Sequence, residues 1–149
     1  MFARANLNDS MHRILLVDDT KTDEKLALLA IAASGVEVST TVARDGQAAL
    51  DHLLPDGDAT PKLPDLVPLD LHLPKVSGSD VLRRVRADAR TKTLPIVMFT
   101  STDDPAEIAM CVDLGASAFV SKPVGYEELV DAMKTMLVFW LKLDRRARM

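Results

Sequence analysis

The sequence predicts an α/β fold, a doubly wound (βα)5 arrangement in which a five-stranded parallel sheet has helices on both faces. Two observations predict it. Short apolar runs typical of buried strands alternate five times with longer stretches of helical periodicity. The 149 residues, of which 48% are hydrophobic and 27% charged, suit one domain with a single core. Strands separated by helices favour parallel pairing.

The first two strand–helix units follow from local periodicity. Residues 13–17 (RILLV) form a short apolar run that ends in acidic residues, which indicates a buried strand. Residues 21–34 show helical periodicity until a glycine stops it. Residues 36–43 (VEVSTTVA) are β-branched and alternate in polarity, as a strand does. A second helix is expected over 45–54, with an aspartate as its cap and a proline after it.

Three further units follow a polar, proline-rich loop at 55–64. This loop is too short to separate two domains. The remaining strands are expected at 66–69, 94–99 and 116–120, and the remaining helices at 79–89, 105–114 and 126–143.

Polar side chains follow the expected strands, at the edge where ligands bind in sheets of this kind. They are Asp18, Asp19, Asp70, Thr100, Ser101 and Lys122. Crowded carboxylates raise one another's pKa unless a cation offsets their charge. A set of donors made only of oxygen suits Mg²⁺ better than zinc, which prefers nitrogen and sulfur. A bound Mg²⁺ would in turn attract a phosphoryl donor.

Composition excludes several classes of protein. The net charge of −4 argues against a nucleic-acid binder, and we interpret the basic run Arg145, Arg146 and Arg148 as a solvated tail. The single cysteine, Cys111, excludes an intrachain disulfide. The first residues lack the apolar core of a signal peptide, and no apolar stretch approaches the roughly 20 residues of a membrane span. We therefore expect a cytoplasmic protein without a membrane segment.

Four motifs lie at the strand ends: LLVDD at 15–19, DLHLPKVSG at 70–78, FTS at 99–101 and AFVSKP at 118–123. Together and in this order they make the chain similar to the receiver domain of two-component response regulators over nearly its whole length. The resemblance implies a flavodoxin-like sheet with strand order 2-1-3-4-5. It places the receiver domain at 13–143, with an N-terminal extension at 1–12 and a C-terminal tail at 144–149.

The resemblance also implies a role for each site residue. Asp70 would be the phosphoacceptor, a nucleophile that attacks the phosphohistidine of a sensor histidine kinase. Asp19 and Asp70 would bind Mg²⁺ directly, together with the backbone carbonyl of His72, and Asp18 would act through a bound water. Lys122 would pair with the phosphoryl oxygens and neutralise developing charge.

A switch that reports phosphorylation is implied in the same way. Thr100, with Ser101 beside it, would donate its hydroxyl to a phosphoryl oxygen after transfer and draw the following loop inward. Phe119 would turn into the vacated space. In the family the peptide between Lys122 and Pro123 is cis, which would aim the lysine into the site.

Several of these residues have a second interpretation. Asp18 and Asp19 also suit a cap of the first helix, and Thr100 suits a cap of the fourth. Phe119 could be a fixed core aromatic. The imidazole of His72, rather than its carbonyl, could act directly in the site.

Pro68 departs from the family pattern two residues before Asp70, where an aliphatic residue is usual. Proline lacks the N–H that a central strand donates to its neighbour. Either this position faces away from a neighbouring strand, or the strand bulges and shifts Asp70.

The last helix predicts a homodimer. One apolar stripe is expected to face the sheet: Leu129, Met133, Leu137 and Trp140. A second stripe runs beside it: Ala132, Met136, Phe139 and Leu143. A helix with two apolar stripes is usually buried on both sides, so we expect a twin subunit to cover Met136, Phe139 and Leu143. The alternative is a helix that extends past the domain with a few exposed apolar residues.

The long loop at 55–64 and the FWL ending resemble stand-alone regulators paired with bacterial phytochromes. This implies a sensor histidine kinase of the bacteriophytochrome type as partner. Because only about one helix follows Lys122, we expect no DNA-binding domain. The function predicted is that of a single-domain response regulator that promotes its own phosphotransfer and dephosphorylation but is not otherwise an enzyme.

Three other classes of protein fit these residues less well. A phosphorylation-independent adaptor would keep the fold and lose the chemistry, but the residue set is complete. A phosphatase of the haloacid dehalogenase type needs a second aspartate two positions after the nucleophile, where His72 stands. A dinucleotide-binding module needs G-x-G-x-x-G after the first strand, and VDDTKTD occupies that place.

Overall fold

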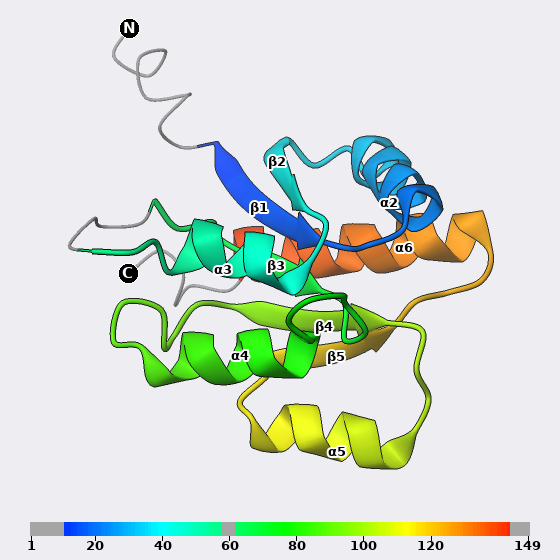
Figure 1. Cartoon of the computed structure of the whole chain (residues 1–149). Coiled ribbons are helices and arrows are strands. Elements are labelled where there is room, and N and C mark those ends of the chain that lie inside the picture. Colours follow the sequence, from blue (N-terminus) through cyan, green and yellow to red (C-terminus); the bar gives the residue numbers. More distant parts are fainter. Residues whose placement is uncertain (1–10, 58–61, 144–149) are drawn as a thin grey trace, which may run out of the picture.

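The computed structural model describes residues 11–57 and 62–143 (Figure 1). The expected tail at 144–149, the first ten residues of the N-terminal extension and loop residues 58–61 lie outside the described residues. Five parallel strands form one sheet in the order β2-β1-β3-β4-β5, which confirms the predicted fold class and strand order. The strands are β1 (His12–Val17), β2 (Val38–Ala43), β3 (Val67–Leu69), β4 (Ile96–Thr100) and β5 (Ala118–Ser121).

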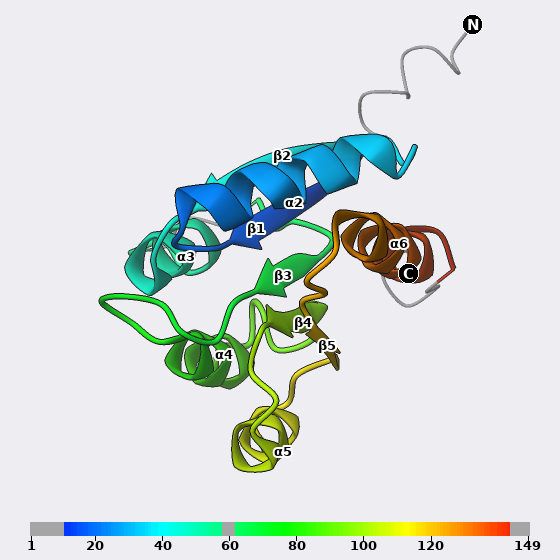
Figure 2. The same ribbon diagram turned by 90° about the vertical axis from the view of Figure 1, so that its right-hand side faces the viewer.

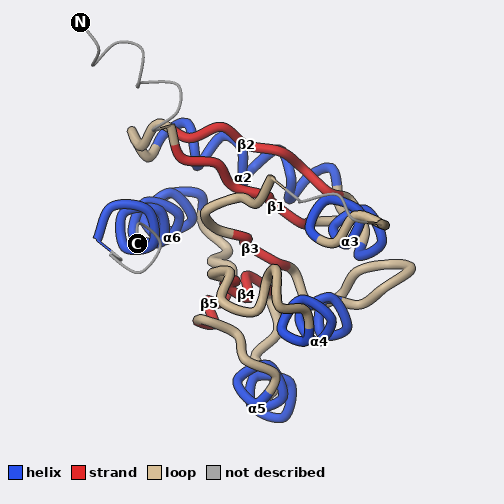
Figure 3. Tube along the Cα trace, turned by 90° about the vertical axis from the view of Figure 1, so that its left-hand side faces the viewer, coloured by secondary structure: helices blue, strands red, loops and turns tan. Residues whose placement is uncertain are grey.

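Helices cover both faces of this sheet. They are α2 (Lys21–Ala33), α3 (Gly46–Leu53), α4 (Gly78–Ala87), α5 (Pro105–Asp113), α6 (Tyr126–Leu137) and η1 (Val138–Leu143). Figures 2 and 3 view the sheet from its two ends, with α2 and α6 on one side and α3, α4 and α5 on the other. Each face has its own buried apolar cluster. None of the helices in the described part of the chain combines the length and the apolar character that crossing a membrane requires.

Side-chain caps begin four of these helices. The caps of α2, α3, α4 and α5 are Thr20, Asp45, Ser77 and Asp104. Each accepts a hydrogen bond from a backbone N–H two or three residues further on, which satisfies a donor in the first turn. The interpretation of Asp18, Asp19 or Thr100 as helix caps is therefore wrong.

Pro68 lies in β3 without a bulge. The pairing with β1 keeps one register on either side of it, with Ile14 opposite Leu66 and Val17 opposite Leu69. The backbone N–H of Asp70, two residues after Pro68, donates to the Val17 carbonyl of β1 at 3.0 Å. Backbone groups two residues apart in a strand face the same neighbouring strand, so the nitrogen of Pro68 also faces β1. The β1–β3 ladder therefore lacks one donor, and both sequence-based explanations of Pro68 are wrong.

The last helix continues to Leu143 but changes form. It is α-helical to Leu137, and residues 138–143 form a π-helix. Its buried side chains are Leu129, Met133, Met136, Leu137, Trp140 and Leu141. Trp140 and Leu141 of the π-helical end are buried in the same apolar cluster as Met133 and Leu137, so the helix packs against the sheet through its last turn as well.

Candidate functional site

Three carboxylates meet at the carboxyl end of the sheet. Asp18 and Asp19 follow β1 and Asp70 follows β3, and one oxygen of each lies within 4.8 Å of the others. The Asp18 N–H donates to Ala43 at 3.1 Å and the Asp70 N–H donates to Val17 at 3.0 Å. Asp18 and Asp70 are buried, whereas Asp19 is exposed. Backbone pairing thus fixes two carboxylates in the interior, and the third opens the cluster to solvent.

Lys122 brings a cation to this cluster from the end of β5. Its Nζ lies 2.8 Å from Asp18 Oδ2, 3.0 Å from Asp70 Oδ2 and 3.5 Å from Asp23 Oδ2. The backbone N–H of Lys122 donates to the Thr100 carbonyl at 2.8 Å, which extends the β4–β5 pairing by one residue. The peptide bonds of the described residues are all trans, so the expected cis peptide before the following proline is wrong. Strand pairing places the lysine in the site without it.

Burial and charge act in opposite directions on these groups. Burial raises the pKa of Asp18, although the hydrogen bond and charge of Lys122 lower it in part. Burial alone would lower the pKa of Lys122, but the hydrogen bonds and charges of Asp18 and Asp70 outweigh burial and raise it. The ammonium is therefore charged at neutral pH.

The donor set fits a hard divalent cation. The three carboxylates offer only oxygen, and exposed Asp19 leaves room for the waters that Mg²⁺ keeps in protein sites. Within the described residues this is the one group of three or more acidic, histidine or cysteine side chains with this geometry. Nitrogen and sulfur ligands, which zinc prefers, are absent from that group.

Thr100 and Phe119 lie on the same face of the sheet. Thr100 is 1% exposed, and Phe119 is half-buried against the apolar cluster of the α3–α5 face. Met98 belongs to that cluster, precedes Thr100 by two residues and pairs with Phe119, so alternation puts all three on this face. Ser101 is exposed and lines a pocket of about 280 Å³ with Lys122. The switch role of Phe119 and its role as a fixed aromatic both stay predictions.

The side chain of His72 contacts α5. Its imidazole Nε2 lies 3.2 Å from Glu107 Oε2, whereas the backbone N–H of His72 donates to Asp70 Oδ1 at 3.4 Å. The imidazole is 65% exposed. The backbone carbonyl of His72 as a metal ligand stays a prediction.

A sequence profile described as the response regulator receiver domain matches residues 14–134. The chain belongs to the response regulator receiver domain family. Among curated relatives, it is 29% identical to Response regulator Rcp1 of Synechocystis sp. over 131 residues, which are 87% of this chain and 88% of Rcp1.

Solved structures of receiver domains agree with this assignment. The crystal structure of the phosphorylated cyanobacterial phytochrome response regulator RcpA matches with a TM-score of 0.81 and 31% identity, over 89% of this chain and 96% of that one. The Mn²⁺-bound form of Rcp1 matches with a TM-score of 0.79 and 28% identity, over 88% and 95%. The resemblance to phytochrome-associated regulators is therefore confirmed.

Two acidic residues of this receiver domain were missed by sequence reasoning. Asp23 in the first turn of α2 adds a third carboxylate beside Lys122. Glu107 in α5 contacts His72. Both stand in a first helical turn, where acidic residues are common for reasons of the helix dipole alone. Asp23 follows Asp18 by five residues and Glu107 follows Thr100 by seven. This short distance from a predicted site residue was the only sign in the sequence that either one lies near the site.

Two glycines let helices approach the loop that follows Asp70. A Cβ at Gly78 would lie 2.2 Å from the Asp70 carbonyl oxygen, and a Cβ at Gly46 would lie 1.8 Å from the Val76 carbonyl oxygen. The Gly78 N–H donates to the Leu71 carbonyl at 2.8 Å. The receiver fold thus holds the β3–α4 loop against α3 and α4 by direct backbone contact.

The predicted dimer residues are not equally accessible. Phe139 is 50% exposed, whereas Met136 is buried within the chain, and the side chain of Leu143 lies outside the described residues. A groove of about 570 Å³ between β5 and the last helix is lined in part by Val120, Met136, Phe139 and Trp140. The protein itself thus covers part of the second apolar stripe, and the dimer stays a prediction.

Proposed function

We propose that this receiver domain accepts a phosphoryl group on Asp70 from the phosphohistidine of a sensor histidine kinase, in a reaction that depends on Mg²⁺. The observation that supports this most is the Asp70 carboxylate itself, set beside Asp18 and Asp19 with Lys122 Nζ at 3.0 Å. A carboxylate next to a fixed cation can attack a phosphoryl group without full repulsion between their charges.

In the proposed step an oxygen of Asp70 forms a new P–O bond while the P–N bond of the phosphohistidine breaks. The imidazole nitrogen of the kinase leaves with the electron pair of that bond. Asp19, Asp70 and the His72 carbonyl would hold Mg²⁺, with Asp18 acting through water, and the bound ion would neutralise charge on the phosphoryl oxygens. Lys122 would pair with the transferred group. Water would later attack the phosphorus, which breaks the P–O bond to Asp70, releases inorganic phosphate and restores the carboxylate. The domain would thus promote its own phosphorylation and dephosphorylation.

The signal would pass through the α3–α5 face. The Thr100 hydroxyl would donate to a phosphoryl oxygen only after transfer, and this new hydrogen bond would draw the β4–α5 loop toward Asp70. Phe119 would then turn toward the space that the loop leaves. Burial of Thr100 beside the site and its common face with Phe119 support this route.

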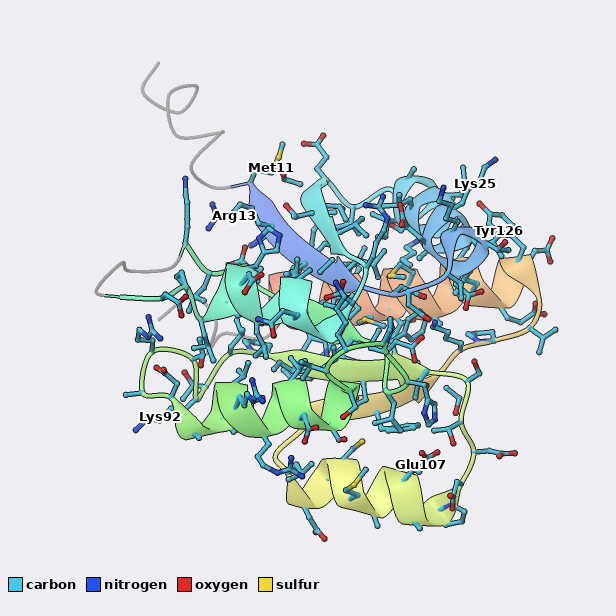
Figure 4. The ribbon with its side chains drawn as sticks, viewed as in Figure 1. Met11, Arg13, Lys25, Lys92, Glu107 and Tyr126 are labelled. Atoms are coloured by element: carbon cyan, nitrogen blue, oxygen red, sulfur yellow. The ribbon has the colours of Figure 1, made fainter. Side chains whose placement is uncertain are left out.

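A protein donor is supported by an apolar rim beside the site. Leu26, Val124 and Tyr126 are exposed and line the same pocket as Lys122. Figure 4 shows Tyr126 at the end of α6 that lies next to α2. The similarity to Rcp1 and to the phytochrome regulator RcpA supports a kinase of the bacteriophytochrome type, and hence a cytoplasmic location.

The test is incubation of the protein with acetyl phosphate and Mg²⁺, followed by intact-mass measurement. We expect a mass increase of one phosphoryl group that is absent in Asp70→Asn and absent when a chelator removes Mg²⁺. Asp103→Asn, an exposed aspartate of the β4–α5 loop, serves as a control that should still be phosphorylated. If the wild-type protein binds Mg²⁺ but gains no mass, the phosphorylation-independent adaptor becomes the better hypothesis.

We also propose that two copies associate through the groove between β5 and the last helix. Exposed Phe139 lines this groove together with Val120 and Trp140, and a second copy can cover these apolar side chains. The two-fold arrangement would let each Phe139 enter the groove of the other copy.

A further inference from the structure

A pocket of about 810 Å³ lies at the end of the sheet opposite Asp70. Part of its lining comes from the residues just before β3, β4 and β5, namely Asp65, Pro95 and Ser117. Because the strands are parallel, these three positions share the amino edge of the sheet. Figure 4 shows Lys92, which also lines the pocket, at the far end of the molecule from Tyr126.

The guanidinium of Arg86 is held at this pocket by three neutral acceptors. Its Nε–H donates to the Gly115 carbonyl at 2.8 Å. Nη1 donates to the Thr91 carbonyl at 3.4 Å, and Nη2 donates to the Ser117 hydroxyl oxygen at 3.3 Å. A guanidinium carries five N–H groups, so one N–H on each terminal nitrogen has no acceptor among the described residues.

The hydroxyl of Ser117 adds another unused donor beside Arg86. Its oxygen accepts from Arg86 Nη2 and, at 3.0 Å, from the backbone N–H of Ile96. Within residues 11–57 and 62–143 its own O–H has no acceptor. A hydroxyl and a fixed guanidinium, both with donors to spare, together suit a ligand that brings several acceptor oxygens.

Positive charge exceeds negative charge in the lining. Neither Arg86 nor Lys92 has an ion-pair partner in the described part of the chain. Of the described residues that line the pocket, Asp65 alone carries a carboxylate, and it already accepts a backbone N–H of β1 at 2.8 Å. Burial lowers the pKa of the Arg86 guanidinium, because its surroundings disfavour the charge that it keeps. An anion at this place would offset that cost.

The pocket is also larger than an inorganic anion needs. Its volume falls within the range of sites for small organic ligands. Apolar side chains form another part of the lining: Leu63, Pro64, Leu94 and Pro95. The chemistry of the walls therefore fits a ligand with an anionic group and an apolar body.

We propose that this pocket binds a phosphate monoester, with the phosphate at Arg86, Ser117 and Lys92 and the organic part against Pro64 and Pro95. A phosphate dianion has three terminal oxygens for the unused donors, whereas a carboxylate has only two and half the charge. The site goes beyond the proposed function, because it lies at the other end of the strands from the phosphoacceptor.

The probe is phenyl phosphate, titrated into ¹⁵N-labelled protein at constant ionic strength, with a chelator present so that no metal draws phosphate to Asp70. Backbone amide shifts in ¹H–¹⁵N NMR spectra report where it binds. We expect saturable shifts at Thr93, Gly115 and Ser117. Inorganic phosphate, which lacks the organic part, and benzoate, which lacks the second charge, should each bind more weakly.

Three variants test the residues that carry the proposal. Lys92→Gln removes an exposed charge without a structural contact and should weaken phenyl phosphate binding about two- to five-fold. Arg86→Gln should weaken it about ten-fold or more, because hydrogen bonds to charged groups are stronger. Arg84→Gln is the matched control: it removes an exposed arginine of the same helix that does not line the pocket, and binding should not change.

The inference is wrong if no saturable shifts occur at the pocket, if benzoate or inorganic phosphate binds as tightly as phenyl phosphate, or if Arg84→Gln weakens binding as much as Lys92→Gln. Because Lys92→Gln touches no packed side chain, its result stands even where Arg86→Gln fails to fold. Asp70→Asn should bind phenyl phosphate as the wild type does, and Lys92→Gln should still be phosphorylated by acetyl phosphate. Failure of one proposal is therefore distinguishable from failure of the other.

Discussion

At the scale of the residue, Lys122 decides the electrostatics of the site. Its ammonium contacts the carboxylates of Asp18, Asp70 and Asp23, which come from three different elements. Its raised pKa means that the folded protein holds this proton more tightly than the unfolded chain. The resulting stability is complete below the ordinary value of 10.5 and is lost as the pH rises through the folded-state pKa.

Replacement of Lys122 by methionine should expose this contribution. Two buried carboxylates then face each other without a cation, so the free energy of unfolding without Mg²⁺ should fall by roughly 1–3 kcal/mol at pH 7. Urea unfolding monitored by circular dichroism measures it. The variant should also lose the decline in stability that we expect of the wild type above pH 10.5. An unchanged alkaline profile would contradict the assignment of the proton to Lys122.

Asp18→Asn should have the opposite effect on stability. Because burial raises the pKa of Asp18, the folded protein binds this proton more readily than the unfolded chain, and stability falls as the pH rises from 3.8 through the folded-state pKa. The asparagine side chain has no proton to lose, so the variant does not undergo this loss of stability. We expect the free energy of unfolding in a chelator to rise by about 0.5–2 kcal/mol at pH 7. The added stability that Mg²⁺ gives the wild type should shrink in the variant, and a less stable Asp18→Asn protein would refute the argument.

At the scale of the element, the start of α4 sets the position of the β3–α4 loop, which begins with Asp70. Gly78 approaches the Asp70 carbonyl so closely that any Cβ would overlap backbone atoms, which cannot move aside as a side chain can. The helix and the end of β3 are therefore placed by one contact. A side chain at position 78 would therefore push on the backbone of Asp70 and displace its carboxylate.

Gly78→Ala should lower the free energy of unfolding by roughly 1–3 kcal/mol, as forced overpacking does, and should also slow phosphorylation by acetyl phosphate. Gly35→Ala is a suitable control. Its backbone φ of +78° makes alanine strained, yet no heavy atom lies within 4 Å of the added Cβ. The control should lose stability and keep its phosphorylation rate; if both variants slow equally, instability rather than displacement of Asp70 is the cause.

At the scale of the whole molecule, apolar periodicity was sufficient to predict a parallel sheet with helices on both faces, because strands and helices alternate strictly. The strand order came from the resemblance to receiver domains. The strand-end argument also predicted that Asp18, Asp19, Asp70 and Lys122 meet. The contacts of Asp23 and Glu107 were not predictable, since they depend on how helices sit over loops. The π-helical end and the burial of Met136 were missed for a similar reason: they depend on helix-to-sheet packing, which sequence spacing alone does not determine.

The proposed dimer gives a prediction at this scale. Phe139→Glu places a charge at the rim of the groove between β5 and the last helix, and desolvating it at an interface is unfavourable. We expect the variant to be a monomer by light scattering at concentrations where the wild type is a dimer. Val112→Glu, at a 61% exposed apolar position in α5, should leave the mass unchanged. A wild-type monomer, or a dimer that survives Phe139→Glu, would exclude this interface.

Alternation along β5 has a mechanical consequence. Phe119 points to the α3–α5 face, whereas Ala118 and Val120 on either side of it line the groove of the opposite face. The proposed switch and the proposed dimer surface therefore lie on opposite faces of the sheet, and β5 contributes a residue to each. A rotation or shift of β5, which has a partner strand on one side only, would transmit phosphorylation from one face to the subunit contact on the other.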